Sequence, residues 1–111
     1  MQNSKFSIFK STNNNQYYYR LRSANGEIIL NGEGYTAKHS CTSAIVSVRI
    51  NAPVDNRYER NDSTNNYTFN LKSGNGEIIG RSENYTSYAA RENGIDAVKC
   101  GAPGAPIEDL S

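Results

Sequence analysis

The chain has 111 residues, a formal net charge of +1 and a hydrophobic content of 36%. A net charge so close to zero argues against a protein that relies on a basic surface to bind nucleic acids or membranes. No apolar run approaches the roughly 18 residues needed to cross a bilayer, and the first residues lack the apolar stretch of a secretory signal. We therefore expect a cytoplasmic protein without a membrane segment.

One pentapeptide, Asn-Gly-Glu-Ile-Ile, occurs twice, at residues 25–29 and 75–79. Further matches at the same spacing of fifty positions extend without a gap from residue 15 to residue 53 of the first copy. Each half would struggle to bury a core alone, so one domain over residues 1–111 is expected. It contains repeat 1 at about residues 4–53, repeat 2 at about residues 54–103 and a flexible tail at residues 104–111.

The first copy begins with segments in which apolar and polar residues alternate, which is typical of half-buried strands. In the second segment, Tyr17, Tyr19 and Leu21 share one face. Asn25 and Gly26 follow, and both tolerate the positive φ that a type I′ hairpin turn requires. The expected strands are residues 5–10, 17–22 and 27–30, with a polar turn at residues 12–15.

A short helix is expected next, because the hydroxyl of Thr36 can accept a hydrogen bond from a free backbone N–H at a helix start. The helix is expected at about residues 37–43. Residues 45–50 are then expected to form a fourth strand, and residues 51–56 to link the two copies.

The second copy predicts the same order of elements. Its helix is expected to start at Thr86 and to run through Arg91. Asn93 and Gly94 should end that helix, because glycine suits the left-handed position that follows many helices. The expected strands are residues 57–60, 67–71, 77–80 and 95–100, and residues 101–111 are expected to fray. The order β-β-β-α-β, twice, predicts a two-layer α+β fold.

The alternation also predicts which side chains form the core, although the adjacent pairs Ile28-Ile29 and Ile78-Ile79 are ambiguous because neighbouring strand residues face opposite ways. The predicted core of the first copy is Phe6, Ile8, Tyr17, Tyr19, Leu21, Ile28, Leu30, Ile45, Val48 and Ile50. That of the second copy is Tyr58, Tyr67, Phe69, Leu71, Ile78, Ile95 and Val98.

Few residues suggest catalysis or metal binding. Catalytic carboxylates need a pocket and a raised pKa in at least one of them, and we interpret the repeated carboxylates as solvated residues of the hairpin and helix start. The single histidine is interpreted as a surface residue, and the two cysteines as free thiols, although a disulfide is possible. No cofactor or metal is expected. The residues concerned are Glu27, Glu77, Glu33, Glu83, His39, Cys41 and Cys100.

One strand face could form a binding surface. Tyr18, Arg20 and Arg22 project from the same face of residues 17–22, and Lys72 matches Arg22 in the second copy. Aromatic and basic groups on a sheet can stack bases and pair with phosphates. The second copy dilutes this pattern, and an antiparallel sheet also needs polar residues on its solvent side. The alternative interpretation is therefore that these side chains only face the solvent and bind nothing.

The runs YYYRLRSANGEIIL with EGYTAK, and YTFNLKSGNGEIIG with SENYTS, resemble the YegP-like family of small bacterial tandem-repeat proteins. Asn93, Gly94, Ile95 and the segment around Val98 extend this resemblance, which covers about residues 5–103. It implies a single antiparallel sheet built from two β-β-β-α-β units that exchange their last strands, with both helices on one face. It implies no established biochemical function, so no site residue is carried over.

Three functions remain open at this point. The first is a non-enzymatic module that binds a protein or small ligand through the sheet face or an edge strand. The second is a weak binder of single-stranded nucleic acid through the face of Tyr18, Arg20 and Arg22. The third, an enzyme, is disfavoured because no set of acid, base and nucleophile is evident. We expect a monomer in which the two repeats resemble the subunits of a dimer.

Overall fold

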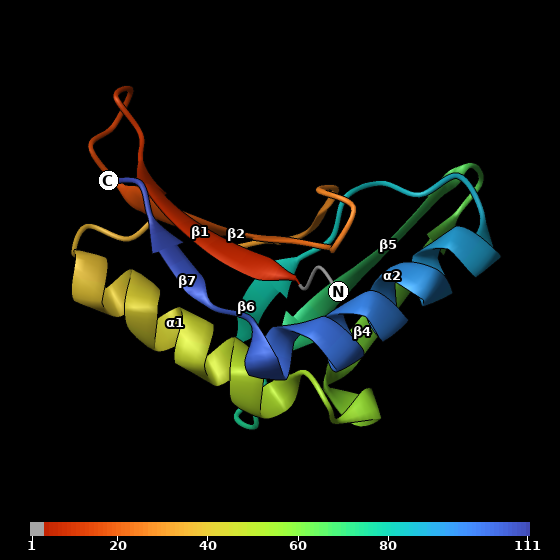
Figure 1. Ribbon diagram of the computed structural model, residues 1–111. Coiled ribbons are helices and arrows are strands. Elements are labelled where there is room, and N and C mark those ends of the chain that lie inside the picture. The colour runs from red at the N-terminus through yellow and green to blue at the C-terminus, as the bar shows by residue number, and fades with distance from the viewer. Residues whose placement is uncertain (1–3) are drawn as a thin grey trace.

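The computed structural model describes residues 4–111, which form one seven-stranded sheet with two helices on one face (Figure 1). The predicted α+β class and the tandem arrangement are confirmed. Neither helix is long and apolar enough to cross a membrane. The strands are β1 (Lys5–Lys10), β2 (Tyr17–Arg22), β3 (Ile28–Asn31), β4 (Tyr58–Ser63), β5 (Asn66–Lys72), β6 (Ile78–Arg81) and β7 (Ile107–Asp109). The helices are α1 (Lys38–Asn51) and α2 (Tyr88–Gly101), with short 3-10 turns η1 (Asp55–Arg57) and η2 (Ala102–Gly104).

The strand order is β4-β5-β6-β3-β2-β1-β7. Each repeat contributes three consecutive antiparallel strands, and the two sets meet where β3 pairs with β6 through Asn31 and Arg81. This junction marks a pseudo-twofold axis between the repeats. The sheet is mixed rather than wholly antiparallel, because β7 runs parallel to β1.

The two segments predicted as fourth strands, residues 45–50 and 95–100, are the second halves of α1 and α2. Ile45 and Val48 are fully buried and lie three positions apart, which is the spacing of one helix face. Ile50, which a strand would have turned inward, is 68% exposed. The prediction was wrong because the period of 3.6 continues to the end of each helix.

Gly94 lies inside α2 and does not end it, contrary to the prediction. Its small size is explained by packing, since a Cβ atom at Gly94 would lie 2.8 Å from Cζ of Tyr85. The residue that caps α2 is Ser87, whose Oγ accepts the backbone N–H of Ala90 at 3.1 Å, rather than Thr86. Thr36 does not cap α1 either, because that helix begins after Ala37 without a side-chain cap.

The hairpins at the repeated pentapeptide form where they were predicted, but their turn type differs. Gly26 and Gly76 have φ of 89° and 87°, whereas neither preceding asparagine has a positive φ. In each hairpin the glycine N–H donates to the serine carbonyl three residues earlier. This is a type I turn followed by a left-handed glycine, the pattern of a three-residue hairpin loop.

The segment expected to be a frayed tail is ordered. Ala102 and Ala105 are buried in the core, and β7 follows them along the edge of β1, where Phe6 N–H donates to the Pro106 carbonyl at 2.9 Å. The expected exchange of last strands therefore occurs only in part. Residues 45–50 and 95–100 are helical, and it is β7, which follows α2, that pairs with β1 of the first repeat.

The core lies between the sheet and the helices and includes most of the predicted side chains. Ile29 and Ile79 are the buried members of the ambiguous pairs, whereas Ile28 and Ile78 are only half-buried. Tyr17 and Tyr67 are also half-buried. Several buried residues were not predicted, among them Cys41, Ala52 and Arg91, which is charged and only 1% exposed.

Candidate binding grooves between the repeats

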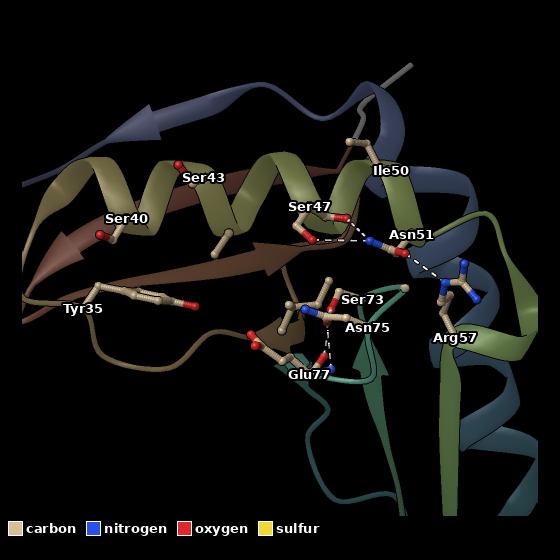
Figure 2. A pocket seen from close by; sticks show the side chains of 13 residues that line it. Tyr35, Ser40, Ser43, Ser47, Ile50, Asn51, Arg57, Ser73, Asn75 and Glu77 are labelled. Carbon is tan, nitrogen blue, oxygen red and sulfur yellow. Dashed lines mark hydrogen bonds between the residues drawn. The ribbon is translucent and has the colours of Figure 1, made fainter.

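Two grooves lie on the helical side of the sheet, in places related by the pseudo-twofold axis. The first groove, of about 610 Å³, lies between α1 of the first repeat and the β5–β6 hairpin of the second (Figure 2). The second groove, of about 400 Å³, lies between α2 and the β2–β3 hairpin. Each groove is therefore built from both repeats and requires the complete chain.

The hairpin wall is the same in both grooves. In the first groove it presents Ser73, Asn75, Glu77 and Ile79, and Tyr35 lies beside it at the start of α1. The second groove has the same five residue types at positions fifty residues away: Ser23, Asn25, Glu27, Ile29 and Tyr85.

The hairpin is held in shape by its own polar side chains. Asn75 Oδ1 accepts the backbone N–H of Glu77 at 3.3 Å and the hydroxyl of Ser73. Figure 2 shows Asn75 and Glu77 across from α1. Because Asn75 accepts these hydrogen bonds within the loop, the exposed carboxylate of Glu77 is not used there and lines the groove. Burial, assisted by the charge of Glu33, raises the pKa of Tyr35, so its hydroxyl stays protonated at neutral pH.

The helix walls differ between the grooves. α1 presents Ser40, Ser43, Ala44 and Ser47 to the first groove. Matching positions of α2 are less rich in hydroxyls: Ala90, Asn93, Gly94 and Ala97. The ring of Tyr85 lies against Gly94, where a Cβ atom would clash with it, whereas the first groove has Ala44 at that position. The first groove is therefore both larger and more polar along its helix.

One end of the first groove carries a chain of hydrogen bonds (Figure 2). Asn51 Nδ2 donates to the Ser47 carbonyl at 2.8 Å, and Arg57 Nε donates to Asn51 Oδ1 at 3.0 Å. The second copy has Ala97 and Gly101 in place of Ser47 and Asn51, so it cannot form this chain.

The surface predicted from the sequence is only partly assembled. Tyr18 and Arg20 lie on the outer face of the sheet and are joined by Phe9. The Tyr18 and Phe9 rings stack with centroids 5.7 Å apart, and the Arg20 guanidinium lies 4.4 Å from the Phe9 centroid. Tyr18 and Arg20 therefore each already contact the Phe9 ring.

Arg22 and Lys72 are not brought together. Since β2 and β5 are separated by β3 and β6 and run in opposite directions, their last residues lie at opposite ends of the sheet. Arg22 Nη1 donates to the Gly26 carbonyl at 3.1 Å, and Lys72 pairs with Glu59 at 3.0 Å.

The remaining candidate residues do not form one site. Glu33 pairs with Arg81 at 2.8 Å and Glu83 accepts from Asn31 at 3.0 Å, so both connect the repeats across the outer face. His39 lies in a shallow hollow on the solvent side of α1. Glu27 and Glu77 were interpreted as solvated hairpin residues, yet each lines a groove.

The two cysteines are free thiols, as predicted. Burial raises the pKa of the Cys41 thiol to about 11, so it stays protonated and a poor nucleophile. Within residues 4–111, no group of three His, Cys, Asp or Glu side chains could hold a metal ion.

Sequence reasoning missed the grooves because their helix walls lie partly in segments that were predicted as strands. The sequence feature that could have indicated the grooves is the repetition of the hairpin residues in both copies. Four residue types retained in both hairpins, serine, asparagine, glutamate and the second isoleucine, line both grooves.

Sequence comparisons agree with this repeated architecture. A family described as a domain of unknown function, DUF1508, matches residues 13–59 and 62–109. The UPF0339 protein YegP of Yersinia pestis is 42% identical over 55 residues, which are 50% of this chain and 49% of that protein. A UPF0339 protein of Treponema denticola is 49% identical over 49 residues, which are 44% of this chain and 83% of that protein. The sequence match with YegP thus spans about half of the relative's length.

Solved structures extend the likeness to the whole fold. The solution NMR structure of E. coli yegP, a protein of unknown function, has a TM-score of 0.90 at 39% identity and covers 99% of this chain and 95% of its own. That of the UPF0339 protein SO3888 from Shewanella oneidensis has a TM-score of 0.89 at 40% identity, with coverage of 96% and 91%. With both repeats matched and the fold shared from end to end, the chain belongs to the DUF1508 family.

Proposed function

We propose that the protein is a non-enzymatic binding module that holds a short peptide segment of a partner protein in the first groove. The observation that carries this proposal is the presence of hydrogen-bonding groups on both walls of one groove. Serine hydroxyls line α1, and an asparagine amide and a carboxylate line the facing hairpin. Groups of these kinds can pair with the N–H and C=O of an extended main chain.

The size and the mixed character of the groove support this occupant. Its volume of about 610 Å³ falls within the range of ligand sites, which is roughly 300–1,000 Å³. Ala44, Ile79 and Tyr35 add apolar surface between the polar groups. A peptide offers the same alternation of polar main chain and apolar side chain.

The chemistry of the lining groups favours binding over catalysis. A serine nucleophile needs a neighbouring base within hydrogen-bond reach. In residues 4–111, the groove serines Ser40 and Ser43 have no hydrogen-bonded histidine or carboxylate, and Ser47 Oγ accepts from the Asn51 amide at 3.3 Å. The high pKa of Tyr35 also makes its hydroxyl a weak acid.

The test is an NMR titration of the ¹⁵N-labelled chain with synthetic pools of short random peptides. We expect saturable shifts in the backbone amides of residues 40–47 and 73–77. The blocking variant is Ser43→Trp, which fills the first groove from an exposed position of α1. Its matched control is Asn93→Trp, at the corresponding exposed position of α2.

Binding should be lost in Ser43→Trp and kept in Asn93→Trp, with both variants folded by their amide dispersion. Absence of any saturable shift, or equal loss in both variants, would contradict the proposal. Turnover of a bound peptide, followed by mass spectrometry, would contradict the non-enzymatic part.

A second candidate is weak binding of single-stranded nucleic acid on the outer face. The observation in its favour is that Arg20 forms no ion pair within the described chain and lies 4.4 Å from the Phe9 ring, which stacks with Tyr18. Affinity for a fluorescent oligothymidine should then fall steeply with salt, because counterions are released on binding. Affinity that is undetectable at low salt, or unchanged in Arg20→Ala, removes this candidate.

A further inference from the structure

We propose that the Arg57 end of the first groove is an oxyanion subsite, which holds a carboxylate or phosphate group of the ligand. The inference rests on the groove being a binding site and adds the chemical class of group that it selects. Three observations support it: Arg57 lies at the groove, its charge forms no ion pair among residues 4–111, and the second groove has no equivalent group.

The guanidinium of Arg57 is held in place by the side-chain amide oxygens of Asn51 and Asn56, which accept hydrogen bonds from it. Asn51 is 8% exposed, and its Nδ2 faces the Ser47 carbonyl, which can only accept. Its Oδ1 must therefore point the other way, where it accepts Arg57 Nε at 3.0 Å. Asn56 Oδ1 accepts Nη1 of Arg57, also at 3.0 Å. Two neutral amides thus orient the guanidinium before any ligand arrives.

The positive charge of Arg57 is not neutralised. Arg60, Arg81 and Arg91 each pair with a carboxylate, whereas Arg57 forms no ion pair with any residue from 4 to 111. Its Nη2 has no hydrogen-bond partner in that same part of the chain and lies 3.5 Å from the Cβ position of Gly74, on the groove-lining hairpin. Free donors of an oriented guanidinium are matched to the oxygens of a carboxylate or phosphate.

The other charged group of the groove, the Glu77 carboxylate, indicates which second group the ligand should carry. Glu77 lines the same groove without a cationic partner among the described residues. A ligand that places an oxyanion at Arg57 and an N–H or ammonium donor at Glu77 satisfies both groups. A peptide main chain with one acidic group meets this requirement.

The second groove lacks the hydrogen-bonded chain that orients Arg57. Ala97 and Gly101 replace Ser47 and Asn51. By the strand pairings, Lys5 takes the place of Arg57, and its charge is paired with Glu108 at 3.3 Å. Ser4 packs at Gly101, where a Cβ atom would lie 2.8 Å from that of the serine. The two grooves therefore share a hairpin wall but differ in the charge that they offer, so we assign the oxyanion to the first groove only.

The test observes the Nε–Hε signals of the arginines while the full chain is titrated separately with acetate and with inorganic phosphate at constant ionic strength. We expect a saturable shift at Arg57. Arg22 is the matched control, because it also lacks an acidic partner in the described chain but donates to a backbone carbonyl outside the first groove. Saturation with acetate alone indicates a carboxylate ligand, and saturation with phosphate alone indicates a phosphate ligand.

Variants separate the subsite from general charge. Arg57→Gln should weaken oxyanion binding about tenfold or more, because a charge-assisted hydrogen bond is lost, and Arg57→Lys should retain part of it. Ser47→Ala, which removes only a relay hydroxyl, should shift the free Arg57 Nε–Hε signal and weaken binding less. Equal responses at Arg22 and Arg57, or binding unchanged in folded Arg57→Gln and Arg57→Lys, would overturn the subsite.

The outcome is distinguishable from that of the proposed function. Peptide binding that is unchanged in Arg57→Gln overturns the subsite and leaves the groove as a peptide site. Oxyanion binding at Arg57 without any peptide binding supports the subsite and removes the peptide function.

Discussion

Leu21 and Leu71 occupy matching places in the two halves of the core, and both are fully buried. We predict that Leu21→Ala and Leu71→Ala each lower the free energy of unfolding by about 2–5 kcal/mol, because each removes buried apolar atoms and leaves a cavity. Urea denaturation followed by circular dichroism measures both. Losses below about 1 kcal/mol at the two positions would show that the strand phase is wrong.

Arg91 is a buried charged residue that the hydrophobic pattern could not reveal. Its guanidinium donates to Glu92 at 2.9 Å, to the Asn61 carbonyl at 3.2 Å and to Asp62. Its charge also lies 5.6 Å from the Tyr67 ring. The corresponding residue of the first repeat is Cys41, so this polar cluster belongs to one repeat only.

We predict that Arg91→Ala costs about 3 kcal/mol of unfolding free energy, because it removes a fully buried side chain, leaves a cavity and breaks the hydrogen bonds that the guanidinium donates. Arg60→Ala is the comparison, since Arg60 also pairs with Glu92 but its side chain is 30% exposed. That change should cost less than about 1 kcal/mol, as expected for exposed ion pairs. Equal costs in thermal or urea melts would contradict the distinction.

At the scale of single elements, the two helix starts provide a matched pair. Ser87 caps α2 through the Ala90 N–H, whereas α1 has no side-chain cap after Ala37. We predict that Ser87→Ala costs about 1 kcal/mol, while Thr86→Ala, one residue earlier, changes stability by only a few tenths. Chemical denaturation of the two variants decides between them, and the reverse order would assign the cap to Thr86.

The strands and hairpins were predictable from sequence because their period of two and their Asn-Gly turns are local signals. The ends of the helices were predicted wrongly because residues 45–50 are rich in β-branched side chains, which favour strands. The three-residue spacing of the buried Ile45 and Val48 fits a helix and not a strand. Gly94 was also predicted wrongly, because its role depends on the distant Tyr85 ring rather than on backbone conformation. The hairpin half of each groove was thus visible in the sequence, and the helix half was not.

The attachment of β7 is expected to depend on pH. Hydrogen bonds from Ser111 and Lys38 lower the pKa of Asp109 to about 2, below an unfolded value of about 3.9. A lowered folded pKa means that the contribution to stability is complete above about pH 4 and is lost as the pH falls towards 2. Hydrogen bonds from Lys99 and Arg60 lower the pKa of Asp55 in the same way.

We therefore predict that Asp109→Asn lowers the urea midpoint at pH 5 and that its difference from the parent chain shrinks towards pH 2. The effect should also weaken in high salt, because the carboxylate is exposed and screened. Asp55→Asn, near the opposite edge of the sheet, should show the same pH dependence, because the pKa of Asp55 is also lowered to about 2. A difference between Asp109→Asn and the parent that stays constant from pH 5 to pH 2 would contradict the role of this carboxylate.

At the scale of the whole molecule, the two repeats are complementary rather than interchangeable. A Cβ atom at Gly80 would lie 2.7 Å from Cδ2 of Leu30, so the leucine of one repeat fills the space that the glycine of the other leaves. The hydroxyl of Tyr19 also donates to the Ile79 carbonyl across the junction, whereas Phe69, at the matching position, has no hydroxyl.

We predict that residues 1–53, expressed alone, either dimerise or fail to fold, because α1 packs on the hairpin of the other repeat and half a core is too small. Two copies of Leu30 would meet at the junction, so failure to fold is the outcome we favour. Sedimentation equilibrium together with circular dichroism tests this. A folded, monomeric fragment would show that one repeat is self-sufficient.

The pairing of β7 with β1 also sets the order in which the chain can mature. The strand that covers the edge of β1 is made about a hundred residues after it, so a nascent chain that has not reached residue 107 carries an open strand edge. Unpaired edges are templates for pairing with other chains. During synthesis, the amino-terminal hairpin therefore stays vulnerable to aggregation until translation has passed through the final strand, and a ribosome that stalls late leaves it unprotected.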